Sequence, residues 1–233
     1  MPFHKLIFTA LAATALATSA NAGLVVRSVG TGAAAFPVGR TVTPGTPINL
    51  AAGDMLTILD GQTTRTFRGP GSFDLGRAAQ ATTALASAST ALSSQATTRK
   101  PRLGTVRGVP PIDSPTLWDI DIDALDNSNQ CVVDPATTVL RRTDTSTTRT
   151  LTIQPENAGK PITITMASGT AGAKWPKALP APGRYTLTEG DMRRNLTLAK
   201  APSPTGNPTA DAEVLITLGC TRQLERFVSS LEK

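Results

Sequence analysis

The chain is poor in the side chains on which most enzyme mechanisms depend. Among its 233 residues there is one histidine, aromatic residues make up 4%, and charged residues make up 17%. The histidine is His4, which lies in a segment predicted below to be removed, so the mature chain has no imidazole. This absence excludes Ser-His-Asp and Cys-His catalysis and histidine-ligated zinc. No other catalytic signature stands out, so the sequence predicts a protein that is not an enzyme and uses no cofactor.

Long apolar runs are also missing, apart from one near the start. Residues 1–22 have the three parts of a secretory signal peptide: a positive charge at Lys5, an apolar stretch over 6–16, and Ala-Asn-Ala at 20–22 before Gly23. The apolar stretch is shorter than the roughly 20 residues of a membrane-spanning helix, and no later stretch reaches that length. We therefore expect cleavage after Ala22, a periplasmic or secreted mature protein, and no transmembrane segment after cleavage.

Cysteine is scarce, and the two that occur are Cys131 and Cys220. In an oxidising compartment this pair predicts one disulfide, which closes a loop of about 90 residues and stabilises the fold by at most about 4–5 kcal/mol in the chain-entropy model. A redox pair is the alternative. It is disfavoured because there is no Cys-x-x-Cys motif and no cluster of cations beside either cysteine.

Basic residues exceed acidic ones, giving a formal net charge of +6, but they are scattered along the chain. Nucleic-acid binding usually needs a basic face with interleaved aromatic residues, so no nucleic-acid partner is expected. A weak attraction to anionic polymers or lipid headgroups of the cell envelope is the simpler consequence of the charge.

Residues 23–73 are predicted to form a small β module. Its expected strands cover 24–29, 47–50, 55–60 and 63–67. Asp60-Gly61 has the preferred chemistry of a tight hairpin, and Gly53 supplies a turn before the third strand. Gly69-Pro70-Gly71 is expected to end the sheet, because proline cannot donate a hydrogen bond to a strand ladder.

The same segment resembles a known domain. Residues 25–27 (VVR), 51–61 (AAGDMLTILDG) and 64–73 (TRTFRGPGSF) resemble the periplasmic FecR-type domain, a short β-roll marked by a G-D turn, a strand, a D-G hairpin and a G-P-G exit. The resemblance covers about residues 24–73. With the later Leu-Trp strand and Cys-Val-x-Asp-Pro segment, the chain also resembles exported proteins of alphaproteobacteria.

What the FecR-type resemblance implies is a role in signalling or assembly. Regulators of that family join the domain to a membrane helix and to a cytoplasmic segment that contacts a sigma factor. Neither is found in this sequence, so a signalling role would need a membrane partner.

Residues 74–115 are predicted to join two modules. The stretch 74–98 is rich in Ala, Ser and Thr, and its apolar residues fall on a thin helical stripe, so a bridging helix that needs packing from elsewhere is expected. The stretch 99–115 contains Pro101, Pro110, Pro111 and Pro115, which is typical of an extended connector.

Residues 116–233 are predicted to form an antiparallel β-sandwich that ends in a helix. The first strand alternates, with Trp118, Ile120 and Ile122 pointing inward and Asp119, Asp121 and Asp123 outward. Further strands are expected at 130–133, 138–142, 149–153, 162–166, 171–175, 184–188 and 196–199.

The chain is expected to end in a single helix. Thr209 is the predicted N-cap. One apolar face is expected to carry Ile216, Cys220, Leu224, Phe227, Val228 and Leu231, so the disulfide would attach the helix to the sandwich.

One acidic series is a weak candidate for a metal site: Asp119, Asp121, Asp123 and Asp126. Calcium loops use closely spaced carboxylates, but here Ala124 occupies the glycine position of such a loop and Gln130 the glutamate position. A solvated strand face explains the first three carboxylates without metal, and no metal is expected.

Trp175 and Tyr185 are candidate contacts for a partner, because aromatic side chains contribute strongly to interfaces. The alternative for both is a place in the core of the sandwich.

The leading hypothesis for function is a non-enzymatic exported protein that binds or scaffolds a periplasmic or membrane partner, with signalling as one such role. The alternative is a binding module for anionic or polysaccharide envelope material. Salt separates the two, because binding to a charged polymer weakens with ionic strength whereas an apolar interface persists. The sequence leaves the partner and the oligomeric state open.

Overall fold

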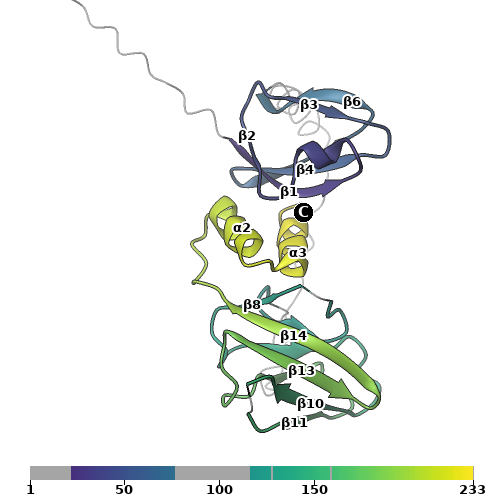
Figure 1. Ribbon diagram of the computed structural model, residues 1–233, viewed down its shortest axis with the longest axis vertical. Coiled ribbons are helices and arrows are strands. Elements are labelled where there is room, and N and C mark those ends of the chain that lie inside the picture. The colour runs from purple at the N-terminus through teal and green to yellow at the C-terminus, as the bar shows by residue number, and fades with distance from the viewer. Residues whose placement is uncertain (1–21, 77–115, 127, 158, 233) are drawn as a thin grey trace, which may run out of the picture.

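A computed structural model describes residues 22–76, 116–126, 128–157 and 159–232, which form two β modules with two helices between them (Figure 1). The prediction of a mainly β protein is confirmed. The predicted signal peptide, apart from Ala22, and most of the predicted helix and connector over 74–115 lie outside the described residues. Within the described ranges no helix combines the length and apolar character needed to cross a membrane.

The N-terminal module contains two small antiparallel sheets. Four strands lie in the order β2-β1-β4-β5, and β3 pairs with β6. The bounds are β1 Gly23–Val29, β2 Thr41–Val42, β3 Pro47–Leu50, β4 Met55–Asp60, β5 Thr63–Arg68 and β6 Gly71–Asp74, with a short 3-10 helix at Ala33–Ala35. Val25, Ile48, Leu56 and Ile58 are among the buried residues that form the core of this module.

The turn before β4 depends on Asp54, which is buried. Its carboxylate accepts a hydrogen bond from the backbone N–H of Ala51 at 2.6 Å. Gly30 and Gly32 approach that carboxylate so closely that a Cβ on either would lie within 2.0 and 2.3 Å of its oxygens. Glycine is therefore required at both positions to let the loop after β1 close over Asp54.

The predicted Asp60-Gly61 hairpin is confirmed, since β4 and β5 pair directly on either side of it and Gly61 has φ +62°. The prediction that Gly69-Pro70-Gly71 ends the sheet is wrong in part. The chain leaves the four-stranded sheet there but continues as β6, which pairs with β3. The ring of Phe73 then packs 5.4 Å from that of Phe67, so an apolar contact draws the segment back onto the module.

The C-terminal module contains a five-stranded sheet in the order β11-β10-β13-β14-β8 and a three-stranded sheet in the order β12-β9-β7. The bounds are β7 Ile120–Asp121, β8 Gln130–Val132, β9 Val139–Arg141, β10 Arg149–Pro155, β11 Ile162–Met166, β12 Gly172–Lys174, β13 Gly183–Glu189 and β14 Met192–Lys200. Two pairings, β14 with β8 and β7 with β9, are parallel, so the sheets are not purely antiparallel. Long intervening segments supply the crossovers that parallel pairing requires.

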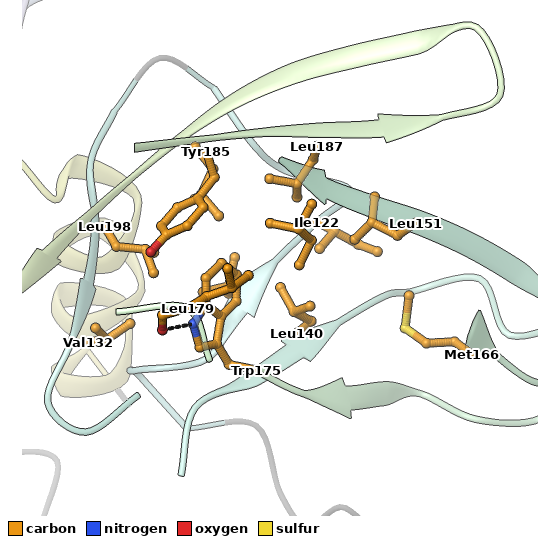
Figure 2. Packing of buried hydrophobic residues seen from close by; sticks show 13 residues of the cluster. Ile122, Val132, Leu140, Leu151, Met166, Trp175, Leu179, Tyr185, Leu187 and Leu198 are labelled. Atoms are coloured by element: carbon orange, nitrogen blue, oxygen red, sulfur yellow. Dashed lines mark hydrogen bonds between the residues drawn. The ribbon is translucent and has the colours of Figure 1, made fainter. Parts of the chain in front are cut away.

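The core between these sheets contains both aromatic residues that were candidates for partner contact (Figure 2). Trp175 and Tyr185 are each 2% exposed, and their rings meet edge to face at 5.1 Å. The indole N–H of Trp175 donates to the carbonyl of Leu179 at 2.9 Å, and the hydroxyl of Tyr185 donates to the carbonyl of Pro180. Of the two alternatives, the structure therefore shows the place in the core and not the exposed partner contact, and each polar group has a hydrogen-bond partner inside.

The predicted C-terminal helix is two helices, α2 at Pro208–Thr217 and α3 at Thr221–Leu231. Gly219 breaks the helix with φ +70°, and Cys220 is the N-cap of α3. The N-cap of α2 is Asn207 and not Thr209, because the Asn207 side chain accepts from the N–H groups of Thr209 and Ala210. Asn207 lies two residues before Thr209, immediately before the first helical residue, and from there its side chain reaches the free amides of the first turn.

The two helices lie between the modules and contribute to an apolar cluster with both (Figure 1). Leu24, Val26 and Leu59 come from the N-terminal module, and Cys131 and Ala201 come from the C-terminal module. The helices contribute Ala212, Leu215, Cys220, Leu224 and Val228. Among the described residues, α2 and α3 are therefore the packed connection between the two β modules.

The helix corner is fixed to β8 by the predicted disulfide, which is confirmed between Cys131 and Cys220, with Cα atoms 5.8 Å apart. Beside it, the fully buried side chain of Gln223 accepts from the N–H of Cys131 and donates to the carbonyls of Cys131 and Leu117, at 2.5, 2.7 and 2.9 Å. Asn129 adds a bond from its amide to the carbonyl of Leu218 at 2.7 Å.

We expect the double substitution Cys131→Ala and Cys220→Ala to lower the free energy of unfolding by about 2–4 kcal/mol, because the unfolded chain gains entropy when this long loop is opened. Urea unfolding of both proteins measures the change. Reductant should destabilise the native protein to a similar extent and leave the variant unaffected. Equal stability of the native protein with and without reductant would contradict the structural role of the bond.

Candidate functional site

The acidic series considered as a metal site does not converge. Asp121 accepts from the N–H groups of Asp123 and Ala124, and Asp126 accepts from Ser128 and pairs with Arg222 at 2.9 Å. Asp121 is therefore satisfied by nearby backbone amides, and Asp126 by Ser128 and Arg222. Among the described residues, no group of three or more His, Cys, Asp or Glu side chains is placed to hold a metal ion.

Asp119 points inward, which corrects the prediction of an outward carboxylate. Its side chain is 3% exposed and pairs with Arg141 at 2.5 Å, while also accepting from the N–H of Thr116 at 2.9 Å. The predicted strand is shortened to β7, Ile120–Asp121, because Asp119 and Asp121 bond to nearby backbone amides and form turns on either side.

Asp123 belongs to a three-member charge cluster with Arg149 and Glu189, at the end of the C-terminal module. Arg149 bonds to Asp123 at 2.5 Å and to both oxygens of Glu189. The hydrogen bonds from Arg149 hold the pKa of Glu189 below its ordinary value. Burial alone would raise the pKa of Asp123, but bonds from Arg149 and the Thr143 amide outweigh it and lower that pKa. The two carboxylates in turn raise the pKa of Arg149.

In this cluster each charge is held in an ion pair. Such an arrangement stabilises the fold and does not favour proton transfer.

A groove of about 700 Å³ lies where β1 meets the two helices. Its lining is largely apolar and comes from segments at opposite ends of the chain: Val26, Val29, Val38, Leu215, Ile216 and Leu224. Val29 and Val38 are 49% and 42% exposed, and the only other large apolar side chain so exposed in the described ranges is Met192. Two of the three exposed apolar side chains therefore line one groove, which we call the junction groove.

The walls of the junction groove are held by packing between modules. Leu215 and Leu224 are buried in the cluster that also contains Val26. The loop before β2 passes so near α2 that a Cβ on Gly39 would lie 3.1 Å from a methyl group of Ile216. Because these contacts join residues far apart in sequence, no local pattern indicated the groove, although the apolar face predicted for the C-terminal helix included two of its residues.

The junction groove continues into a second hollow of about 400 Å³. Arg27 and Glu225 line both, and Arg226, Ser229 and Ser230 line the second. Arg226 donates to the carbonyls of Leu117 and Asp119, and burial lowers the pKa of its guanidinium. The groove thus runs from an apolar part to an end that presents both a positive and a negative side chain.

No family model, curated protein or solved structure matches this chain. The likeness of residues 24–73 to the FecR-type domain accordingly stays a prediction from the residues themselves. The G-D, D-G and G-P-G motifs that carry it lie at turns in the structure.

We expect Glu189→Gln to destabilise the protein near neutral pH by up to about 1 kcal/mol, the range of a well-placed surface ion pair. A carboxyl with a lowered folded-state pKa stabilises above its unfolded value, here about 4.5, and loses that contribution as the pH falls through the folded value. The difference between native protein and variant should therefore shrink below about pH 4.5. Urea unfolding at several pH values measures this difference in the free energy of unfolding.

Glu213→Gln, on the exposed side of α2, is the control. A difference between the native protein and Glu189→Gln that is constant with pH would contradict the ion pair between Glu189 and Arg149.

Proposed function

We propose that this protein is a non-enzymatic component of the cell envelope that is exported and holds a protein partner by an extended apolar segment in the junction groove. The observation that carries the proposal is the pairing of Val29 and Val38, both about half exposed, over a floor of buried apolar side chains. Exposed apolar side chains that gather in one hollow are typical of interaction sites, because they remain in water until a partner covers them.

Export is supported by two independent features. A disulfide persists in oxidising compartments and is rare in the cytosol. The first 22 residues have the pattern of a cleavable signal peptide. The resemblance of residues 24–73 to the FecR-type domain extends the proposal to a role in signalling or assembly, in which a membrane-spanning partner would carry the signal.

A protein segment suits the junction groove better than a charged polymer does. Val29 and Val38 are apolar and exposed, and the two charged residues shared with the neighbouring hollow, Arg27 and Glu225, have opposite signs. A groove with little net charge gives no strong attraction to a polyanion, whereas its valines and leucines gain free energy when apolar side chains cover them. Binding should consequently depend weakly on salt.

We expect a photo-crosslinking residue at position 38, in protein exported by its native host, to yield one predominant protein adduct. The same residue at position 192, which is also half exposed and apolar in the native chain, should yield none. Mass spectrometry identifies the adduct. The adduct should persist at about 1 M salt, because screening removes charge attraction and leaves apolar contact in place.

Val29→Asp should then reduce the yield of the adduct at position 38 by about tenfold, since a carboxylate in the groove loses its water when the segment binds. Met192→Asp is the matched control and should leave the yield unchanged. Similar adducts at positions 38 and 192, or an adduct at 38 insensitive to Val29→Asp in a variant that melts like the native protein, would contradict the proposal.

A further inference from the structure

A separate cavity of about 290 Å³ lies in the C-terminal module, at the end of the ladder between β10 and β13. Pro155, the last residue of β10, pairs there with Tyr185. The loop that follows β10 and the loop that precedes β13 form its two walls. Its volume is at the lower end of the range of small-ligand sites.

Hydrogen bonds inside the module fix both walls. Gln154 donates from its side-chain amide to the carbonyls of Pro155 and Gly159, at 3.0 and 2.8 Å, and so holds the loop after β10. Tyr185 and Trp175 donate to the carbonyls of Pro180 and Leu179 and so hold the loop before β13. The cavity is therefore formed before any ligand arrives, and binding would not need to order its walls.

Two cationic side chains, Lys160 and Arg184, line this cavity and are exposed. Neither has an ion-pair partner among the described residues, and no acidic side chain lines the cavity. Two other arginines of the same module have structural roles: Arg149 pairs with carboxylates, and Arg142 donates to three backbone carbonyls. The positive charge at the cavity thus has no structural partner within the described part of the chain.

The rest of the lining is mostly apolar and includes Pro155, Ile162, Pro180 and Pro182, and Asn157 adds an amide side chain. An inorganic anion would pair with the cations but gain nothing from this wall. A ligand that combines a carboxylate, an apolar face and hydroxyl groups would use the whole lining. Arginine suits the carboxylate because its planar guanidinium binds two oxygens at once.

From this combination we propose that the cavity binds a uronic acid unit of an acidic polysaccharide. Lys160 and Arg184 pair with the carboxylate, the prolines and Ile162 pack against the C–H face of the sugar ring, and Asn157 hydrogen-bonds its hydroxyl groups. The site is distinct from the junction groove, so either proposal stands or fails without the other.

The test is a titration of the isotopically labelled protein with D-glucuronate, followed by the NMR shifts of backbone amides. We expect saturable shifts with glucuronate at the amides of the lining residues that have one, such as Gly159, Lys160 and Arg184, and much smaller ones with glucose or inorganic phosphate at the same concentration. Arg184→Gln and Lys160→Gln should each weaken binding about tenfold, the loss of one charge-assisted hydrogen bond.

Arg193→Gln and Lys200→Gln are matched controls, because both residues are exposed on β14 and neither lines the cavity. They remove the same charge and should leave binding within about twofold of the native value, since distant exposed charges are screened. Equal weakening by the controls would reduce the effect to general charge and overturn the site. Phosphate binding as strong as glucuronate, with the same sensitivity to Arg184→Gln, would overturn the sugar-acid assignment, and no shifts at these residues would overturn both.

Discussion

The arrangement of this protein depends on how the corner between α2 and α3 is held against β8. The Cys131–Cys220 disulfide fixes one atom of that corner, and the fully buried Gln223 binds both backbone groups of Cys131 beside it. The disulfide alone would still allow α3 to rotate about the single bonds of the two cysteine side chains. The added hydrogen bonds fix the orientation of α3 against β8. Burying the Gln223 amide costs little free energy, because its oxygen and its nitrogen both have hydrogen-bond partners. The corner is therefore buried and held in one orientation.

That corner places the helices where they reach the other module. From it, α2 and α3 extend toward β1 and β4, and Leu24, Val26 and Leu59 complete the apolar cluster from the other side. The junction groove is a consequence of this packing, because it lies where β1 and the loop before β2 meet the two helices, and Val29 and Val38 stay exposed there. The surface proposed to bind a partner therefore depends on the same corner that the disulfide stabilises.

Charge is used sparingly and mostly for structure. Arg142 is buried and donates to the carbonyls of Thr147, Ala167 and Thr170, so one side chain organises two loops. Arg194 donates to the carbonyl of Ile122 in the same manner. Lys160 and Arg184 differ from these arginines: they have no ion-pair partner among the described residues, and both line the small cavity.

The sequence by itself determined most strands of both modules, the hairpin at Asp60-Gly61 and the pairing of its two cysteines, because these follow from local alternation, turn chemistry and simple counting. The tertiary structure decided which side chains are buried and which distant segments come together, because a local pattern does not contain that information. The alternation around Asp119 predicted an outward carboxylate, but Arg141, many residues away, draws it inside. For Trp175 and Tyr185 the sequence left both a core position and a partner contact open, and the structure places both rings in the core, where their donors bond to backbone carbonyls. The junction groove has no sequence signal, because it exists only where the two ends of the described chain meet.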